Sequence, residues 1–134
     1  MKKLLIHIIF FFSLSVTAQE CRDSIEKNIE IKKTKLYKEN AHASYYHDKF
    51  NGRKTASGAK FDNNKLTAAH KKLPFGTKLK ITNEKNNKSV IVVINDRGPF
   101  VNGREIDLSK KAFMDVTSNK GGGVVFVKIE IIEN

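Results

Sequence analysis

Two residues of this sequence have side chains and surroundings suited to proton transfer near neutral pH, Asp96 and His70. Asp96 follows the apolar run at residues 90–94 and enters a turn of Arg, Gly and Pro, so the end of a strand should present its carboxyl at a rim. A carboxyl whose pKa is raised by burial can donate a proton and later take one back. A neutral imidazole at His70 can orient such a carboxyl or bind a hydroxyl group.

These two side chains are expected to share one shallow groove, with Gly98-Pro99 shaping its rim. Two structural interpretations stay open beside the chemical one. Asp96 could cap its turn or pair with Arg97, and His70 could be hydrogen-bonded within the wall of the protein.

Other chemical motifs are weak in this sequence. His47 and His70 are too far apart for metal-ligand spacing, and no cysteine accompanies them. Ser57 does not stand in a nucleophile elbow, and Cys21 has no histidine near it. The glycines at 121–123 lack the lysine and hydroxyl of a phosphate loop. A reaction without a metal or organic cofactor, or a binding role, is therefore expected.

Asp107 and two tyrosines could complete a site. Asp107 is either a second carboxylate facing the groove or the cap of a helix that begins near Ser109, and capping is the favoured interpretation. Tyr45 and Tyr46 are adjacent in an expected strand, so one ring should face inward and the other outward, where it could stack on a ligand.

The elements that must position these residues are short. From residue 41 onward, β-type runs at 43–46, 66–69, 77–82, 89–95 and 123–132 alternate with turn residues. Leu79 and Ile81 alternate with lysines, and a polar turn follows, which predicts a hairpin over 77–95. The run at 90–94 suits a strand buried on both faces or curled into a barrel. With one short helix over 109–116, the pattern predicts an all-β protein with a small closed barrel.

The N-terminal residues are typical of a signal peptide. Two lysines precede an apolar stretch over residues 4–16, and small residues predict cleavage after Ala18. The stretch is shorter than the about 20 apolar residues that a bilayer needs, and the residues before Cys21 differ from those of a lipoprotein. We expect an exported protein, periplasmic or secreted, with no lipid anchor. Its segments would be a signal peptide at 1–18, a charged tether or peripheral helix at 19–40, and the folded domain at 41–134.

The composition limits the partners. The formal net charge is +11, and a basic balance usually suggests nucleic acid. Export excludes that partner and leaves anionic cell-wall polymer, lipid surface or acidic polysaccharide. One cysteine cannot form an internal disulfide, so the core must hold the fold. The length after cleavage suits a single domain, and a monomer without a membrane span is expected.

Six segments occur in an order and spacing that resemble the RlpA (rare lipoprotein A) family, over residues 41–132. The segments are Ala43-Ser44-Tyr45-Tyr46, Gly52-Arg53-Lys54-Thr55-Ala56-Ser57-Gly58, Thr67-Ala68-Ala69-His70, Leu73-Pro74-Phe75-Gly76-Thr77, Asn95-Asp96-Arg97-Gly98-Pro99-Phe100 and Ile106-Asp107-Leu108-Ser109. The resemblance implies a six-stranded double-psi β-barrel with one or two short helices.

The resemblance also implies an activity, that of an endolytic, septal-type lytic transglycosylase acting on peptidoglycan. Such an enzyme protonates the glycosidic oxygen and lets the sugar's 6-hydroxyl close on C1, giving a 1,6-anhydro end without water, metal or nucleotide. The family's catalytic aspartate falls at Asp96 and its groove histidine at His70. Substrate contacts are expected from Tyr46, Thr55, Arg97 and Asp107. A basic groove for muramyl carboxylates is expected from Arg53, Lys54, Arg97 and Arg104. Charges of this kind more often form a solvated face, and that interpretation stays open beside the groove.

One position departs from the family pattern. The family usually has a glutamate, a proposed catalytic partner, directly after the glycine of the Thr-Ala-Ser-Gly segment, and this chain has Ala59 there. Loss of a general acid or base typically costs roughly 10²–10⁴-fold in rate. Either one carboxyl serves as both acid and base, or the domain is a non-catalytic, expansin-like peptidoglycan-binding module. An exported interaction or inhibitor protein that reuses the barrel is a third class, since a fold does not fix a function.

Overall fold

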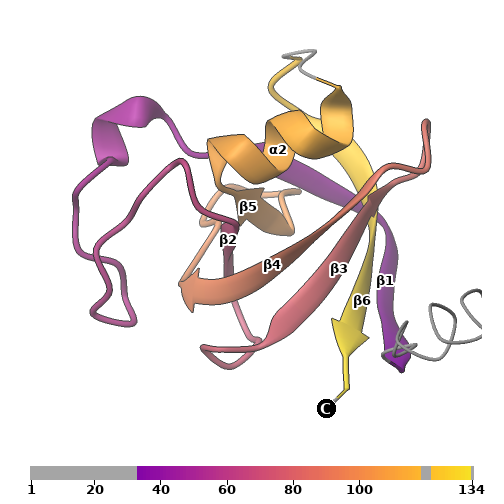
Figure 1. The fold of residues 1–134 in the computed structure, drawn as a ribbon, viewed down its shortest axis with the longest axis horizontal. Coiled ribbons are helices and arrows are strands. Elements are labelled where there is room, and N and C mark those ends of the chain that lie inside the picture. Colours follow the sequence, from indigo (N-terminus) through magenta and orange to yellow (C-terminus); the bar gives the residue numbers. More distant parts are fainter. Residues whose placement is uncertain (1–32, 119–121, 134) are drawn as a thin grey trace, which may run out of the picture. The chain divides into compact units, whose positions relative to one another are not determined.

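The computed structural model describes residues 33–118 and 122–133, and in them six strands close into a barrel in the order β1-β5-β2-β4-β3-β6 (Figure 1). The strands are β1 (Thr34–Tyr45), β2 (Thr67–His70), β3 (Lys78–Asn83), β4 (Ser89–Asp96), β5 (Ile106–Leu108) and β6 (Val125–Ile132). Two short helices accompany them, the 3-10 helix η1 (Asp48–Phe50) and the α-helix α2 (Lys110–Thr117). The predicted all-β barrel with one or two short helices is confirmed.

The barrel wall follows from alternation of side chains. In the hairpin β3–β4, which is the predicted one, the buried residues of β4 are Val90, Val92 and Ile94, while Ile91 between them is 47% exposed. Of the two interpretations of this apolar run, burial on both faces is therefore wrong and the barrel strand is right. Successive residues of a strand point to opposite faces, so only every second one reaches the core.

The first strand begins earlier than predicted. β1 starts at Thr34 and pairs with β6 from Thr34↔Ile132 onward, so a tether or peripheral helix up to residue 40 is wrong for residues 34–40. Two register shifts, between Leu36 and Lys38 and between Lys38 and Ala41, interrupt the period of two. Because bulges of this kind break the alternation of inward and outward side chains, the sequence shows no strand pattern over residues 34–40. The predicted signal peptide and residues 19–32 of the predicted tether lie outside the described residues.

Helix α2 lies over one end of the barrel and packs on it through Ala112, Phe113 and Val116 (Figure 1). Its N-cap is Ser109, whose hydroxyl accepts a hydrogen bond from the amide of Ala112. The Phe113 ring is fully buried and lies 4.6 Å, centroid to centroid, from the Tyr45 ring. Of the helices that the structure describes, none is long and apolar enough for a membrane span.

Candidate active site

Strand β2 brings two carboxylates together. It lies between β4 and β5, and its residue Ala69 is the register partner of both Asp96 in β4 and Asp107 in β5. Register partners on neighbouring strands point to the same face, so both carboxyl groups flank the small side chain of Ala69. A register shift beside Asn95 turns Asp96 onto this face, away from the core face of Ile94.

Asp96 is held by three hydrogen bonds. The Tyr46 hydroxyl donates to its Oδ2 at 2.6 Å, and the backbone amides of Ala56 and Arg97 donate to its Oδ1, each at 2.9 Å. The hydrogen bond from the amide of Arg97 means that Asp96 caps its own turn, the structural role that the sequence left open. The Arg97 guanidinium makes no ion pair with Asp96. The three donors engage both carboxyl oxygens of Asp96 and fix the orientation of its side chain.

Asp107 is a partly buried carboxyl beside Arg104 and Asp96. Its Oδ2 accepts from Arg104 Nη2 at 3.1 Å, while its Oδ1 is buried and has no partner among the described residues. Burial raises the pKa of Asp107, and the nearby charge of Asp96 raises it further, against the opposing effect of Arg104. The favoured capping role is wrong, because Asp107 lies inside β5 and Ser109 caps α2. The alternative was a second carboxylate facing the groove, and of this the structure shows that Asp107 lies near Asp96.

The adjacent tyrosines divide between the two faces as predicted. The Tyr45 ring packs on Phe113 in the core, and the Tyr46 hydroxyl reaches Asp96. The Tyr46 ring lies 4.5 Å from that of Phe61 and 5.8 Å from that of Phe50, centroid to centroid. Burial raises the pKa of Tyr46, and the hydrogen bond to Asp96 adds to this, so the phenol stays a donor. Tyr46 therefore offers the site its hydroxyl rather than an open ring face.

A tight turn at residues 54–60 covers Asp96. Thr55 is buried, its hydroxyl lies 2.9 Å from that of Ser57, and its amide donates to the carbonyl of Ala59. The turn needs Gly58, which has φ +89°. It delivers the amide of Ala56 to Asp96, while Ala59 itself is exposed. Thr55 thus shapes the turn. Ala59, which stands where the family pattern has a glutamate, lies in the same turn as Ala56, whose amide binds Asp96.

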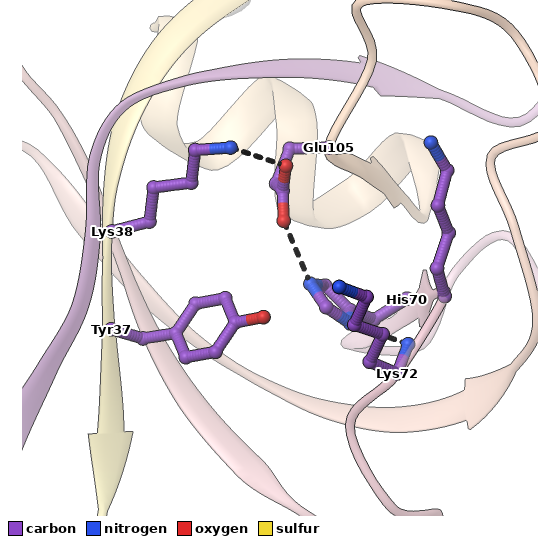
Figure 2. Close-up of a pocket in the computed structure, with 6 residues that line it drawn as sticks. Tyr37, Lys38, His70, Lys72 and Glu105 are labelled. Atoms are coloured by element: carbon purple, nitrogen blue, oxygen red, sulfur yellow. Dashed lines mark hydrogen bonds and ion pairs between the residues drawn. The ribbon is translucent and has the colours of Figure 1, made fainter.

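His70 belongs to a different network (Figure 2). It follows Ala69 in β2, so its side chain points to the face opposite the two carboxylates. Its Nδ1 accepts from the amides of Lys72 and Leu73, both at 3.1 Å, which places the ring proton on Nε2 facing Glu105 Oε1 at 3.2 Å. The expected single groove for His70 and Asp96 is therefore not formed. The interpretation of His70 as part of the wall fits its burial, 1% exposed.

Burial, more than any neighbouring charge, favours the neutral form of His70. Burial is the largest single effect on the pKa of His70 and lowers it, and together with Arg97 and Lys38 it outweighs the opposing effect of Glu105. Burial acts to raise the pKa of Glu105, but Lys38 at 2.6 Å and His70 outweigh it and hold that pKa below its ordinary value. Glu105 was not singled out in the sequence, because only the fold brings it beside a histidine 35 positions away.

The arginines expected to line a basic groove are engaged elsewhere. Arg97 Nη1 donates to the carbonyls of His70 and Leu73, and its guanidinium lies 3.9 Å from the Phe75 ring centroid. Arg104 binds Asp107, and the Arg53 guanidinium lies over the Phe50 ring at 5.4 Å. A substrate contact through Arg97 would have to displace these interactions. Arg97 instead fastens the turn after β2 to the end of β4.

Phe100 is a candidate contact residue that sequence reasoning left unassigned. Its side chain is 85% exposed on the loop that joins Asp96 to Asp107. Its ring lies beside Gly98, where a Cβ would come within 3.5 Å of Phe100 Cε2. An aromatic residue inside a polar turn segment was the available signal, because a large exposed apolar side chain often marks a binding surface.

The His70 network leads to a stability prediction. Replacing His70 by alanine removes the acceptor of two backbone amides and should lower the free energy of unfolding by about 2–3 kcal/mol. Because the pKa of His70 is lowered in the folded state, the unfolded chain binds the extra proton, and stability should fall as pH drops below the ordinary value of 6.5. Urea unfolding at pH 7.5 and 5.5 measures both effects.

The matched variant for this test is His70→Asn, whose Oδ1 can still accept the two amides. It should be more stable than His70→Ala and should lose the part of the pH dependence that His70 contributes. Glu105 does not contribute to the difference in stability between pH 7.5 and 5.5. Because its pKa is lowered in the folded state, it affects stability only below about its ordinary pKa of 4.5. An unchanged pH dependence in His70→Asn would contradict this assignment.

Comparison with known proteins gives consistent matches. The family model described as "Lytic transglycolase" matches residues 38–129. A relative from Rickettsia felis, named an endolytic peptidoglycan transglycosylase RlpA, is 46% identical over 120 residues, which cover 82% of this chain and 52% of that protein. A relative of the same name from Pasteurella multocida is 54% identical over 91 residues, covering 68% and 31%. The chain thus spans about half or less of the length of these relatives.

Solved structures support the fold alone. The Streptomyces papain inhibitor superposes with a TM-score of 0.56 at 20% identity, covering 75% of this chain and 96% of that one. An expansin from Clavibacter michiganensis has a TM-score of 0.56 at 18% identity, covering 76% and 52%. Together with the strand order, these matches identify the barrel as the double-psi type.

Proposed function

The chain belongs to the RlpA-like lytic transglycolase family, and from that membership we propose that it is a lytic transglycosylase that cleaves peptidoglycan glycan strands to 1,6-anhydro ends. The observation that carries the proposal is the pair Asp96–Asp107, which β2 holds on one face of the barrel. One carboxylate accepts three hydrogen bonds as an anion, and burial raises the pKa of the other. Two carboxyls in unlike environments are a common acid–base arrangement.

We assign the proton to Asp107 rather than to Asp96, the first candidate from the sequence. Asp107 would protonate the glycosidic oxygen as the bond from that oxygen to C1 breaks. The resulting carboxylate would then take the proton of the sugar's 6-hydroxyl as its oxygen closes on C1. Asp107 ends protonated, and no water is consumed. Asp96 contributes a fixed negative charge, which raises the pKa of Asp107 and stabilises positive charge developing at C1.

His70 is assigned a positioning role in this proposal. Its imidazole holds the amides of Lys72 and Leu73, and its carbonyl accepts from Arg97, whose own amide binds Asp96. The histidine therefore acts on the carboxylate pair only through this turn. The substrate lies outside the cytoplasmic membrane, which agrees with the signal peptide expected at residues 1–18.

A second candidate function is non-catalytic binding of peptidoglycan. The observation in its favour is Ala59, an exposed methyl group in the turn that binds Asp96, where the family pattern has a glutamate. A domain of this kind would keep the surface for glycan and lack part of the acid–base pair.

Incubation of the purified protein with sacculi, followed by mass spectrometry of the soluble fragments and assay of the pellet, tests the proposal. Fragments with 1,6-anhydro ends, absent with heat-denatured protein, are expected for a lytic transglycosylase. Fragments one water heavier, with reducing ends, would indicate a hydrolase and contradict the proposal. Protein that pellets with sacculi and releases nothing would indicate the binding module.

Phe100 should contribute to glycan contact in either case. Phe100→Ala is expected to weaken pelleting with sacculi by roughly tenfold, the equivalent of about 1.4 kcal/mol, because it removes an exposed apolar surface on the loop between Asp96 and Asp107. The melting temperature should not change, since the ring is 85% exposed. Phe100→Tyr keeps a ring and should bind as the wild type does. Equal binding by Phe100→Ala would exclude the ring from the glycan surface.

A further inference from the structure

A hollow lies on the other side of β2 from the two carboxylates. Its volume is about 460 Å³, and it is lined by Tyr37, Lys38, His70, Lys71, Lys72 and Glu105. The side chains of Tyr37, Lys38, His70 and Glu105 point toward one another around it (Figure 2). The proposed cleavage reaction uses none of these side chains directly.

Among residues 33–118 and 122–133, four charged side chains line this cavity, of which Lys38 and Glu105 form an ion pair and Lys71 and Lys72 do not. Glu105 is neutralised by Lys38, with Nζ 2.6 Å from Oε2, and it accepts the Nε2 hydrogen of a neutral His70. Lys71 and Lys72 are exposed and make no ion pair with any residue that the structure describes. The cavity therefore has a net positive charge, and a cleft with charge of one sign concentrates ligands of the opposite sign.

The two lysines stand on a fixed backbone. His70 Nδ1 binds the amides of Lys72 and Leu73, and Arg97 binds the carbonyls of His70 and Leu73. The amides and carbonyls of the turn at residues 70–73 are thus both hydrogen-bonded. A turn that is already ordered lowers the conformational entropy cost of binding a ligand.

Tyr37 adds a neutral donor to the cavity. Its ring packs edge-on against His70, with centroids 5.4 Å apart and planes at 81°. Its hydroxyl has no hydrogen-bond partner in the described part of the chain, so it is available to a ligand. Two ammonium groups and one hydroxyl are suited to an oxyanion and provide few acceptors for a cation or a neutral sugar.

We propose that this cavity binds a carboxylate of the peptidoglycan strand, with Lys71 and Lys72 as its cations and Tyr37 as its hydrogen-bond donor. The inference rests on the proposed function in taking peptidoglycan as the polymer. The carboxylate can come from the lactyl group of a muramyl sugar without peptide or from a stem peptide. In this proposal the acidic groups are bound by the lysines that follow β2. Arg97 and Arg104 are not used, because both already bind groups within the protein.

The test measures binding of the intact protein to three soluble glycans by titration calorimetry. These are chitin oligosaccharides without carboxylates, amidase-treated glycan strands with lactyl carboxylates, and strands that keep their peptides. The double variant Lys71→Gln, Lys72→Gln should bind at least one carboxylate-bearing glycan about tenfold more weakly and chitin oligosaccharides as the wild type does. The glycan whose binding falls identifies the source of the carboxylate. Tyr37→Phe should give a smaller loss on the same glycan.

The matched control is Lys85→Gln, Lys88→Gln, which removes the same charge from exposed positions on the β3–β4 turn that do not line the cavity. Equal losses in the two double variants, or an equal loss on chitin oligosaccharides, would overturn the cavity proposal. If the wild-type protein still releases anhydro fragments from sacculi, only the cavity proposal fails and the proposed function is retained. A wild-type protein that binds none of the three glycans would overturn both.

Discussion

Asp107→Asn is expected to lower the rate of release of 1,6-anhydro fragments from sacculi by roughly 10²–10⁴-fold, the usual range for loss of a general acid. The asparagine keeps an oxygen for Arg104 and nearly the same volume, so the fold should persist. The rate of the wild type should fall as pH rises through the pKa of Asp107, because only the protonated carboxyl can donate. Mass spectrometry of timed digests over a pH series measures both the loss and the profile.

The comparison with Asp96→Asn separates the roles of the two carboxylates. Removing the charge of Asp96 should lower the pKa of Asp107, because that charge is one of the causes that raise it. The variant should therefore keep some activity and lose it at a lower pH than the wild type. Asp115→Asn, an exposed change of the same kind on α2, is the control. Full activity in Asp107→Asn, with none in Asp96→Asn, would reverse the assignment and restore Asp96 as the acid.

Ala59→Glu is expected to raise the rate of fragment release by about 10²-fold or more, if the missing glutamate costs what a general acid or base typically costs. The position is exposed in the turn that delivers the amide of Ala56 to Asp96, so a longer side chain meets no core. The same digests measure the gain. Ala59→Gln, which has the length without the proton, is the matched control.

The outcome for Ala59→Glu bears on both candidate functions. A wild type that is active and unchanged by the glutamate would mean that the Asp96–Asp107 pair suffices. A wild type that only binds sacculi, with activity appearing in Ala59→Glu but not in Ala59→Gln, would mean that the chain is a binding module derived from an enzyme. Equal gains in both variants would contradict a proton-transfer role for the residue at this position.

The sequence was most informative where local pattern and local geometry agree. The hairpin β3–β4, the helix α2 and the opposite facing of Tyr45 and Tyr46 all follow from periods that the residues themselves display. The segment containing Asp96 could be recognised for the same reason, because a strand end followed by a turn needs no distant partner. The early start of β1 was missed because two register shifts break its period.

The pairing of chemical groups was decided by tertiary structure. The residues that surround Asp96 come from three separate segments, and a single register shift beside Asn95 turns its side chain away from the core and toward Asp107. The same strand sends His70, one residue beyond Ala69, to the opposite face and to Glu105.

Sequence alone therefore determined which residue types are present, the barrel that carries them and the family to which they point. Which of them share a site depended on the face to which each side chain points. In a β-barrel that face alternates at every residue and reverses at every bulge, so a shift of one position decides whether two carboxyl groups lie side by side or on opposite faces. Only the closed barrel, with its strand order and register, fixes that choice.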